Sequence, residues 1–393
     1  MKAFSLSARR ALLWGLAVLL GSCTDPYMPD VITSPEALMV VDGYLNSQGV
    51  TTIRLSRAYG IAAKTAPPAE TRATVYIEDE GGARVVLRES STAGTYVSDN
   101  VTLNPARNVR LHFRTATGKE YASDYVPVKT TPPIDAVKWR IENNDLNIYV
   151  DTHDDTSASQ YYRWETDETW EIYPVYSPGI EYSNGGIRPI SARLPSICWG
   201  NQRSNAVHIA KTTGLTKDVV ADFPLRRLPA NSERFYSRYS ILVQQQVLTR
   251  PEFEYWTLLR KNTESIGSLF DPQPSQLTGN VHCLSSPAEA VLGYVGAHSL
   301  VEKRIFISRA DLPRDQRVLT GYEACVPPDT VYISGPRAAR SPEATILRNA
   351  FLSQLYLPLG YVVNNGSTGY TAKPRDCIDC RTRGASVKPS FWP

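Results

Sequence analysis

The sequence predicts a mainly β protein, with an N-terminal Ig-like β-sandwich, a second β-rich, sandwich-like domain with one α-helix, and a cysteine-bearing C-terminal tail. Three observations lead to this prediction. The 28 prolines, 24 glycines and 22 tyrosines favour short strands joined by turns. Apolar and polar residues alternate in many short runs. The chain of 393 residues, 42% hydrophobic and 21% charged, is long enough for two or three globular domains.

These patterns divide the chain into five segments. Residues 1–22 form a lipoprotein signal peptide and residues 23–35 a tether, whose prolines and acidic residues show no periodicity. Residues 36–130 form the Ig-like sandwich. Residues 131–310 form the second domain, with its helix near 250–265, and residues 311–393 form the C-terminal segment.

The start of the chain resembles a bacterial lipoprotein signal. A basic start precedes an apolar run over residues 11–20, and residues 20–23 read LGSC, with small residues before Cys23. Cleavage would leave Cys23 as an acylated N-terminus. A transmembrane helix or an ordinary signal peptide is the alternative, but the run is shorter than the roughly 20 residues that span a bilayer.

Charge excludes one class of partner. The formal charge of +3 falls to zero once Lys2, Arg9 and Arg10 leave with the signal peptide. The basic footprint of a nucleic-acid-binding protein is therefore absent. No other apolar run is long enough to cross a membrane, so we expect the acyl group to attach the protein to a membrane.

Strand signals follow the tether. Seven short alternating runs predict strands at 38–42, 51–56, 73–78, 83–88, 94–97, 109–115 and 121–126. Gly- and Asn-containing turns separate several of them, and Pro132 and Pro133 end the series. About seven strands in fewer than 100 residues are typical of a small Ig-like sandwich. This domain has no cysteine, so packing must stabilise it.

The second domain opens with a predicted hairpin, 137–141 and 146–151. Long strands are predicted at 160–172 and 235–248, and shorter ones at 291–295 and 304–308. The helix begins at Thr249, where the T-x-x-E sequence to Glu252 predicts a capping box, and ends before Gly267. The tail holds a strand at 329–334 and a helix or strand through 346–357.

Five cysteines besides Cys23 lie in a compartment where disulfides persist; they are Cys198, Cys283, Cys325, Cys377 and Cys380. Two bridges and one free thiol are expected, with the connectivity open. We expect the tail to be joined to the body through Cys325 and either Cys377 or Cys380. The CxxC at 377–380 favours a structural disulfide over a zinc half-site or a redox motif, because it sits in a polar tail.

Several short motifs resemble one family. They are the lipobox followed by Pro26-Tyr27, LMVVDGYLN at 38–46, DPQPSQLTGN at 271–280, Leu292-Gly293-Tyr294 followed by KRIFI at 303–307, CIDCR at 377–381 and KPSFWP at 388–393. In order and spacing they are similar to Bacteroidetes-type outer-membrane lipoproteins of the domain of unknown function 4249 family.

The resemblance implies a lipoprotein of the outer membrane, on its periplasmic side or at the cell surface, usually encoded beside a TonB-dependent transporter. It also implies that residues 36–130 form an Ig-like or carboxypeptidase-regulatory-like sandwich. It supplies no catalytic residue and no cofactor. Cys283 departs from the family pattern, so it is the candidate for the unpaired thiol or for a bridge to Cys198.

One acidic cluster is the best local arrangement for chemistry. Asp151, His153 and Asp155 would project to one side of an extended strand, which suits a weak metal or acid/base site. The turn-like run at 156–159 favours the alternative, a solvated loop leaving a strand. None of the familiar catalytic motifs occurs, so no catalytic residue is assigned.

Aromatic residues gather between 161 and 182. Trp170, Tyr173, Tyr176 and Tyr182 are the predicted binding residues, because Pro174, Pro178 and Gly179 break this part into a loop, and loop aromatics suit sugars, peptides or protein partners. Core packing within a Tyr-rich sheet is the alternative.

The sequence therefore favours a non-catalytic outer-membrane lipoprotein that assists a TonB-dependent transporter in cargo capture or gating, with a glycan or peptide as a further ligand class. A surface hydrolase acting on glycan or peptide is the first alternative. A structural or adhesive envelope protein is the second.

Overall fold

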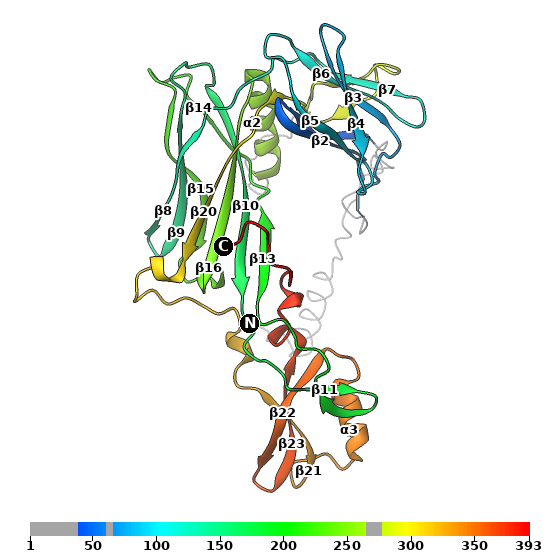
Figure 1. Ribbon diagram of the computed structural model, residues 1–393, viewed down its shortest axis with the longest axis vertical. Coiled ribbons are helices and arrows are strands. Elements are labelled where there is room, and N and C mark those ends of the chain that lie inside the picture. Colours follow the sequence, from blue (N-terminus) through cyan, green and yellow to red (C-terminus); the bar gives the residue numbers. More distant parts are fainter. Residues whose placement is uncertain (1–37, 60–65, 265–276) are drawn as a thin grey trace, which may run out of the picture.

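The computed structural model describes residues 38–59, 66–264 and 277–393. Three β-rich bodies make up these residues (Figure 1): a first sandwich, a longer second sandwich beside it, and a C-terminal module below the second sandwich. The mainly β prediction is confirmed. The lipobox with Cys23 and the tether lie outside the described residues. Within the described ranges, no helix has the length and apolar character needed to cross a membrane.

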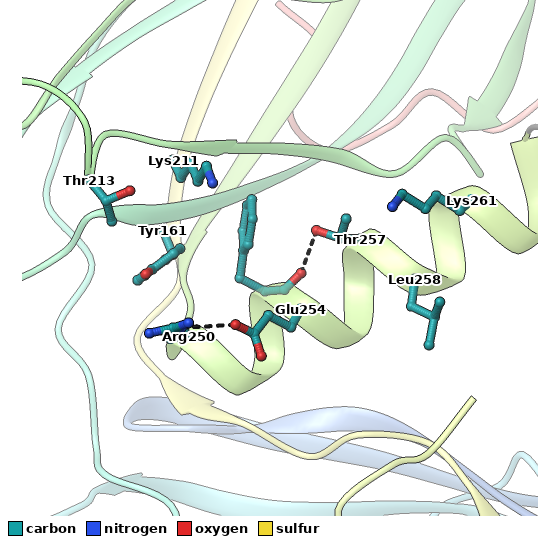
Figure 2. Close-up of a pocket in the computed structure, with 9 residues that line it drawn as sticks. Tyr161, Lys211, Thr213, Arg250, Glu254, Thr257, Leu258 and Lys261 are labelled. Carbon is teal, nitrogen blue, oxygen red and sulfur yellow. Dashed lines mark hydrogen bonds and ion pairs between the residues drawn. The ribbon is translucent and has the colours of Figure 1, made fainter. Parts of the chain in front are cut away.

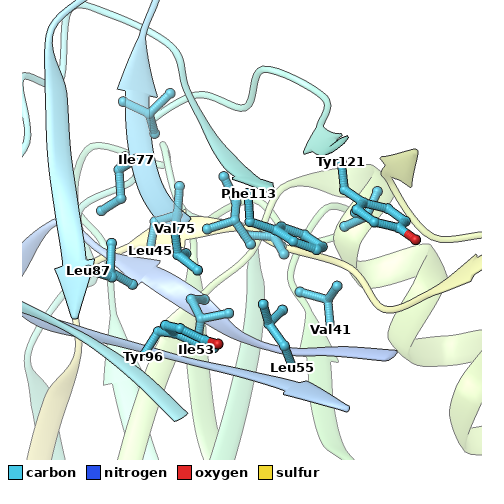
Figure 3. Packing of buried hydrophobic residues seen from close by; sticks show 14 of the residues in the cluster. Val41, Leu45, Ile53, Leu55, Val75, Ile77, Leu87, Tyr96, Phe113 and Tyr121 are labelled. Atoms are coloured by element: carbon cyan, nitrogen blue, oxygen red, sulfur yellow. The ribbon is translucent and has the colours of Figure 1, made fainter. Parts of the chain in front are cut away.

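The first sandwich is one continuous ten-stranded sheet whose halves face each other across a core (Figure 3). Its first seven strands match the seven predicted runs. They are β1 (Met39–Asn46), β2 (Gln48–Arg57), β3 (Thr74–Asp79), β4 (Arg84–Glu89), β5 (Thr95–Thr102), β6 (Val109–Arg114) and β7 (Glu120–Ser123).

Alternation explains why these strands bury one face. Along β2, Ile53 and Leu55 are fully buried while Thr52 and Arg54 between them are exposed, since successive side chains of a strand point to opposite faces. In β1 the alternation passes through Gly43, which has a φ of 128°. A Cβ there would lie 2.5 Å from the Thr52 carbonyl oxygen, so only glycine lets β1 approach β2 this closely.

A segment far along the chain completes the first sandwich. It contributes β17 (Val281–Cys283), which pairs with β7, and β18 (Val291–Leu292) and β19 (Ala297–His298), which pair in parallel with β1. The sequence had placed this segment in the second domain. Local alternation identifies strands but not their distant partners, so this assignment corrects the predicted boundary.

The second sandwich packs a three-stranded sheet against a five-stranded sheet. The smaller sheet contains β8 (Ile134–Glu142), β9 (Asp145–His153) and β15 (Val219–Pro229). The larger contains β10 (Tyr161–Ile172), β13 (Cys198–Arg203), β14 (His208–Lys211), β16 (Arg238–Val247) and β20 (Val301–Ser308). Buried Trp164 lies between the sheets, and its indole N–H donates to Gln245 Oε1 at 2.8 Å.

Helix α2 (Arg250–Glu264) follows β16 directly. Thr249 Oγ1 accepts from the Glu252 backbone N–H at 3.3 Å, which is one half of the predicted capping box. The other half does not form. The Glu252 carboxylate turns away from the helix start, toward His298 of the first sandwich.

The C-terminal module combines a late part of the chain with an insertion from the second sandwich. Its sheet contains β21 (Asp329–Ser334), β22 (Tyr356–Asn364) and β23 (Ser367–Pro374), packed against α3 (Glu343–Phe351). The hairpin of β11 (Ile180–Ser183) and β12 (Gly186–Pro189) adds to it. Residues 346–357, predicted as helix or strand, hold the end of α3 and the start of β22.

Two disulfides hold this module, one between its own segments and one to the second sandwich. Cys325 bonds to Cys377, one of its two predicted partners, and Cys198 at the start of β13 bonds to Cys380. Cys283 is a buried free thiol on β17. The alternative bridge from Cys283 to Cys198 does not form, because the two residues belong to different sandwiches.

Candidate functional site

The acidic cluster at the end of β9 is not assembled into a metal site. Asp151 is ion-paired with Lys138. His153 Nδ1 lies 2.7 Å from a carboxylate oxygen of Asp135, and its Nε2 is 3.7 Å from the exposed Asp155. No group of three metal-ligating side chains occurs in the described ranges. The solvated strand end, which was the alternative, describes this cluster better.

The four predicted aromatic residues are not brought together on one loop. Tyr182 lies on β11, is 9% exposed and packs against Phe351 of α3. Tyr176 is half-buried and donates through its hydroxyl to the Cys325 carbonyl oxygen at 3.0 Å. Both therefore support the C-terminal module. This corrects the prediction that they present a shared binding surface, and the reason is that the insertion carrying them packs as core.

Trp170 is half-buried at the end of β10. Its indole lies across Gly200, where an added Cβ would come within 2.5 Å of the ring. The guanidinium of Arg234 sits 4.2 Å from the ring centroid. These neighbours fix the position of Trp170, so its indole forms part of a surface wall and is not freely exposed to a partner.

Tyr173 is the predicted residue that does face solvent, beside Tyr236, which the sequence did not nominate. Their side chains are 38% and 43% exposed and their ring centroids are 6.3 Å apart. Two adjoining hollows of about 200 and 520 Å³ share these rings. We call this surface the tyrosine groove; its main lining residues are Trp170, Tyr173, Tyr236, Arg238, Arg309 and Arg383.

A hydrogen-bond network holds the groove from behind. The Glu171 carboxylate accepts from Ser237 Oγ at 2.5 Å, from Tyr173 Oη at 3.1 Å and from Trp392 Nε1 at 2.8 Å. Burial raises the pKa of Tyr173 above its ordinary value, so its phenol keeps its proton at neutral pH. The groove therefore presents the Tyr173 ring in a position that is set before any partner arrives.

A second cavity lies where the first sandwich meets β10, β13, β16 and α2. It has a volume of about 340 Å³, and we call it the junction cavity. Its mouth is lined by the exposed side chains of Asp42, Arg54 and Arg203. Its floor is lined by Glu252 and His298, which are 3% and 1% exposed.

The floor contains polar groups without hydrogen-bond partners. Glu252 Oε1 is 3.6 Å from His298 Nε2, beyond ordinary hydrogen-bond length. Glu252 Oε2 and His298 Nδ1 have no partner within the described ranges. The carboxylate fits only because Gly296 has no side chain, since a Cβ there would lie 2.3 Å from Oε2. The His298 ring stacks on Tyr44 with centroids 4.5 Å apart.

The cavity wall is charged but internally paired. Glu165 is ion-paired with Arg163 at 2.7 Å and with Arg203. Although burial alone would raise it, these guanidinium groups hold the pKa of Glu165 below its ordinary value. Arg163 also lies 3.7 Å from the Trp256 ring centroid. Burial and the nearby Glu165 raise the pKa of Tyr44 to about 12, so its phenol stays neutral.

A third hollow, of about 650 Å³, lies on another face of α2 (Figure 2). Arg250 and Glu254 point toward one another there, with 2.9 Å between nitrogen and oxygen. Lys211 and Lys261 are exposed at its rim. None of its charged side chains is buried, so this hollow is a solvated basic surface.

The comparison with known families agrees with the resemblance seen in the sequence. A model described as "Domain of unknown function (DUF4249)" matches residues 24–304. The chain therefore belongs to the DUF4249 family. The match takes in the described parts of both sandwiches up to β20, while residues 305–393 lie beyond it. No curated protein matches this chain.

Two family motifs in the sequence contain residues of the junction cavity, although hydrophobic periodicity gave no indication of the cavity. Asp42, Gly43 and Tyr44 belong to the LMVVDGYLN run, and Tyr294 belongs to the Leu292–Tyr294 motif; all four line the cavity. These two motifs are about 250 residues apart and meet because β18 pairs with β1. The T-x-x-E sequence predicted a helix-capping role for Glu252, so nothing in the sequence indicated that this residue lines the floor of the junction cavity.

Proposed function

We propose that this protein is a non-catalytic lipoprotein of the outer membrane that assists a TonB-dependent transporter in capturing or gating cargo. The lipobox at 20–23 supports anchoring through Cys23, because acyl chains hold a mature chain at a membrane. Family membership is consistent with this role but names no activity.

The observation that carries the binding part of the proposal is the tyrosine groove. Tyrosine and arginine are enriched at protein interfaces, where rigid rings contribute contact area at low entropy cost. Tyr173 and Tyr236 are exposed side by side, with Arg238 and Arg309 next to them. Nothing in the fold uses these two rings as core, which distinguishes them from Tyr176 and Tyr182.

The test replaces both exposed rings. Tyr173→Ala with Tyr236→Ala should weaken co-purification of the transporter from detergent-solubilised membranes by about tenfold or more, as expected when interface anchors are lost. Stability should change by only about 0.5 kcal/mol per site, because exposed side chains contribute little to folding. Quantitative immunoprecipitation and a denaturant titration measure the two effects.

Tyr361→Ala is the matched control, because Tyr361 is also an exposed strand tyrosine, at 60%, but lies on β22 of the C-terminal module. It should co-purify like the native chain. If the double variant retains full association with the transporter, or if no transporter co-purifies with the native chain, the accessory role is wrong. Cys23→Ala separately tests the anchor: the variant should leave the membrane fraction or remain unprocessed.

A further inference from the structure

The junction cavity concentrates polar groups that lack partners. Glu252 Oε2, Trp256 Nε1 and both ring nitrogens of His298 are buried without a hydrogen bond among the described residues, and all three residues line this cavity. Each buried group left unpaired costs roughly 1–3 kcal/mol. So many such groups around one hollow indicate a place where a polar molecule completes the structure.

The size of the hollow suits a small ligand. Its volume of about 340 Å³ falls in the ~300–1,000 Å³ range of small-molecule sites. The walls come from β1 and β2 of one sandwich and from β10, β13 and α2 of the other body. Sites of this kind often lie between domains, where a ligand contacts both.

The charges around the cavity select the class of ligand. Glu165 is matched by two guanidinium groups, those of Arg163 and Arg203, which leaves one positive charge in excess. Asp42 interacts electrostatically with Arg203 and offsets this excess. The exposed Arg54 and the buried Glu252 remain as one positive and one negative group lining the hollow, so the lining is neutral overall and presents both signs.

This arrangement excludes the simplest alternatives for its occupant. Water would satisfy hydrogen bonds but would add no counter-charge to the buried Glu252 carboxylate, whose ion-pair neighbour His298 Nε2 lies as far as 3.6 Å away, and a poorly compensated buried charge is costly. A net anion would meet the carboxylates of Glu252 and Asp42, and a net cation would meet the guanidinium of Arg54. A molecule carrying an ammonium and a carboxylate together matches both.

We propose that the junction cavity binds a small zwitterion, a free amino acid or a short peptide. The ammonium group pairs with Glu252 on the floor and Asp42 at the mouth. The carboxylate pairs with Arg54 and Arg203, since guanidinium groups bind carboxylates in a two-point geometry. Trp256 donates its indole N–H to the ligand. The ligand thereby contacts both sandwiches and fixes their junction.

This site is separate from the tyrosine groove. Arg163 of the cavity and Tyr173 of the groove are ten residues apart along and just beyond β10, roughly 30 Å for an extended chain. A failure of the zwitterion proposal therefore leaves the groove proposal untouched, and the reverse also holds.

Isothermal titration calorimetry on the full chain in detergent, with L-alanyl-L-alanine as the probe, tests the proposal. We expect saturable binding that weakens about tenfold or more when the probe is N-acetylated or C-amidated, because each change removes one charged partner. Glucose, a neutral polyol, should not bind. Absence of saturable binding by the dipeptide, or equal affinity for its blocked forms, overturns the proposal.

Glu252→Gln keeps the shape of the side chain and removes its charge, so dipeptide binding should weaken about tenfold. Glu254→Gln is the matched control, since Glu254 sits on the same helix but on another face, paired with Arg250. It should bind normally. Arg54→Gln is the second variant; Arg54 is exposed, so its loss spares the fold and should weaken binding of the free carboxylate form alone. Native affinity in either Glu252→Gln or Arg54→Gln refutes the assignment.

Discussion

The first sandwich and the C-terminal module are stabilised in opposite ways. The first sandwich has one large buried cluster, which includes Leu45, Ile53, Phe113 and Tyr121, and no disulfide among its described residues. The C-terminal module has two small clusters, one disulfide between its own segments and a second disulfide to β13. A body that buries little apolar surface gains from cross-links that restrict its unfolded chain, whereas a large core does not need them.

The largest effect expected from this comparison is the loss of a core ring in the first sandwich. Phe113→Ala should cost about 3–5 kcal/mol of unfolding free energy, because the ring is fully buried and stacks on Tyr121 with centroids 4.8 Å apart. Denaturant titration measures it. Val86→Ala, at a side chain 55% exposed on the same sheet, should change stability by about 0.5 kcal/mol or less. Equal costs at the two sites would mean that packing does not dominate this sandwich.

The next effect is the loss of a cross-link in the C-terminal module. Replacing Cys325 and Cys377 together by Ser should cost that module about 2–4 kcal/mol, since the bond closes a segment of 52 residues. Limited proteolysis should then cut first within residues 326–376.

The buried thiol of Cys283 reports on the other region in the same experiment. It should stay unreactive toward a thiol reagent in the double variant, because the first sandwich does not depend on the bond. Rapid labelling of Cys283 would show that the two regions unfold together, contrary to the comparison.

The smallest effect is a difference in acid sensitivity. Burial lowers the pKa of His112 below its ordinary value of 6.5. Below about pH 6.5 His112 becomes protonated in the unfolded chain but stays neutral in the folded first sandwich. The stability of this sandwich should therefore fall as the pH drops from about 6.5 toward the lower pKa of the folded state. His112→Gln should flatten this part of the profile.

In the C-terminal module the sensitive group is Asp379. Hydrogen bonds from Arg381, followed by those from Arg375, hold the pKa of its carboxyl below the ordinary 3.8. Its contribution is therefore present above pH 3.8 and lost only as the pH falls below that value. Hydrogen exchange of each region between pH 7 and pH 3 should show the first sandwich weakening first. The opposite order would contradict both assignments.

Local patterns predicted the strands well and their partners less well. The alternating runs in the first 126 residues correspond to β1 through β7. Strand β15 was missed, because Pro224 and the register shifts along it interrupt its alternation. Strand β18 falls within the predicted run at 291–295, whereas β19 was missed because its two residues are too few to show a period.

The structure separates the predicted binding residues into exposed and buried ones. Tyr173 lies on an exposed groove, whereas Tyr182 is core, although both follow turn residues in the same aromatic stretch. Composition identifies such an aromatic stretch but does not predict which ring will be buried against another element. That depends on α3, whose Phe351 covers Tyr182.

The sequence predicted local features by itself: the mainly β class, the turn-bounded strands, Cys325 as one partner of a tail disulfide and the family motifs. These follow from the two-residue period of strands and from the chemistry of single residue types. Only the tertiary structure decided that residues 281–298 close the first sandwich, and that Glu252 meets His298 beneath Asp42 and Arg54. Such long-range contacts depend on strand pairing between distant segments and on the packing of one body against another. The local periodicity of the sequence does not predict either.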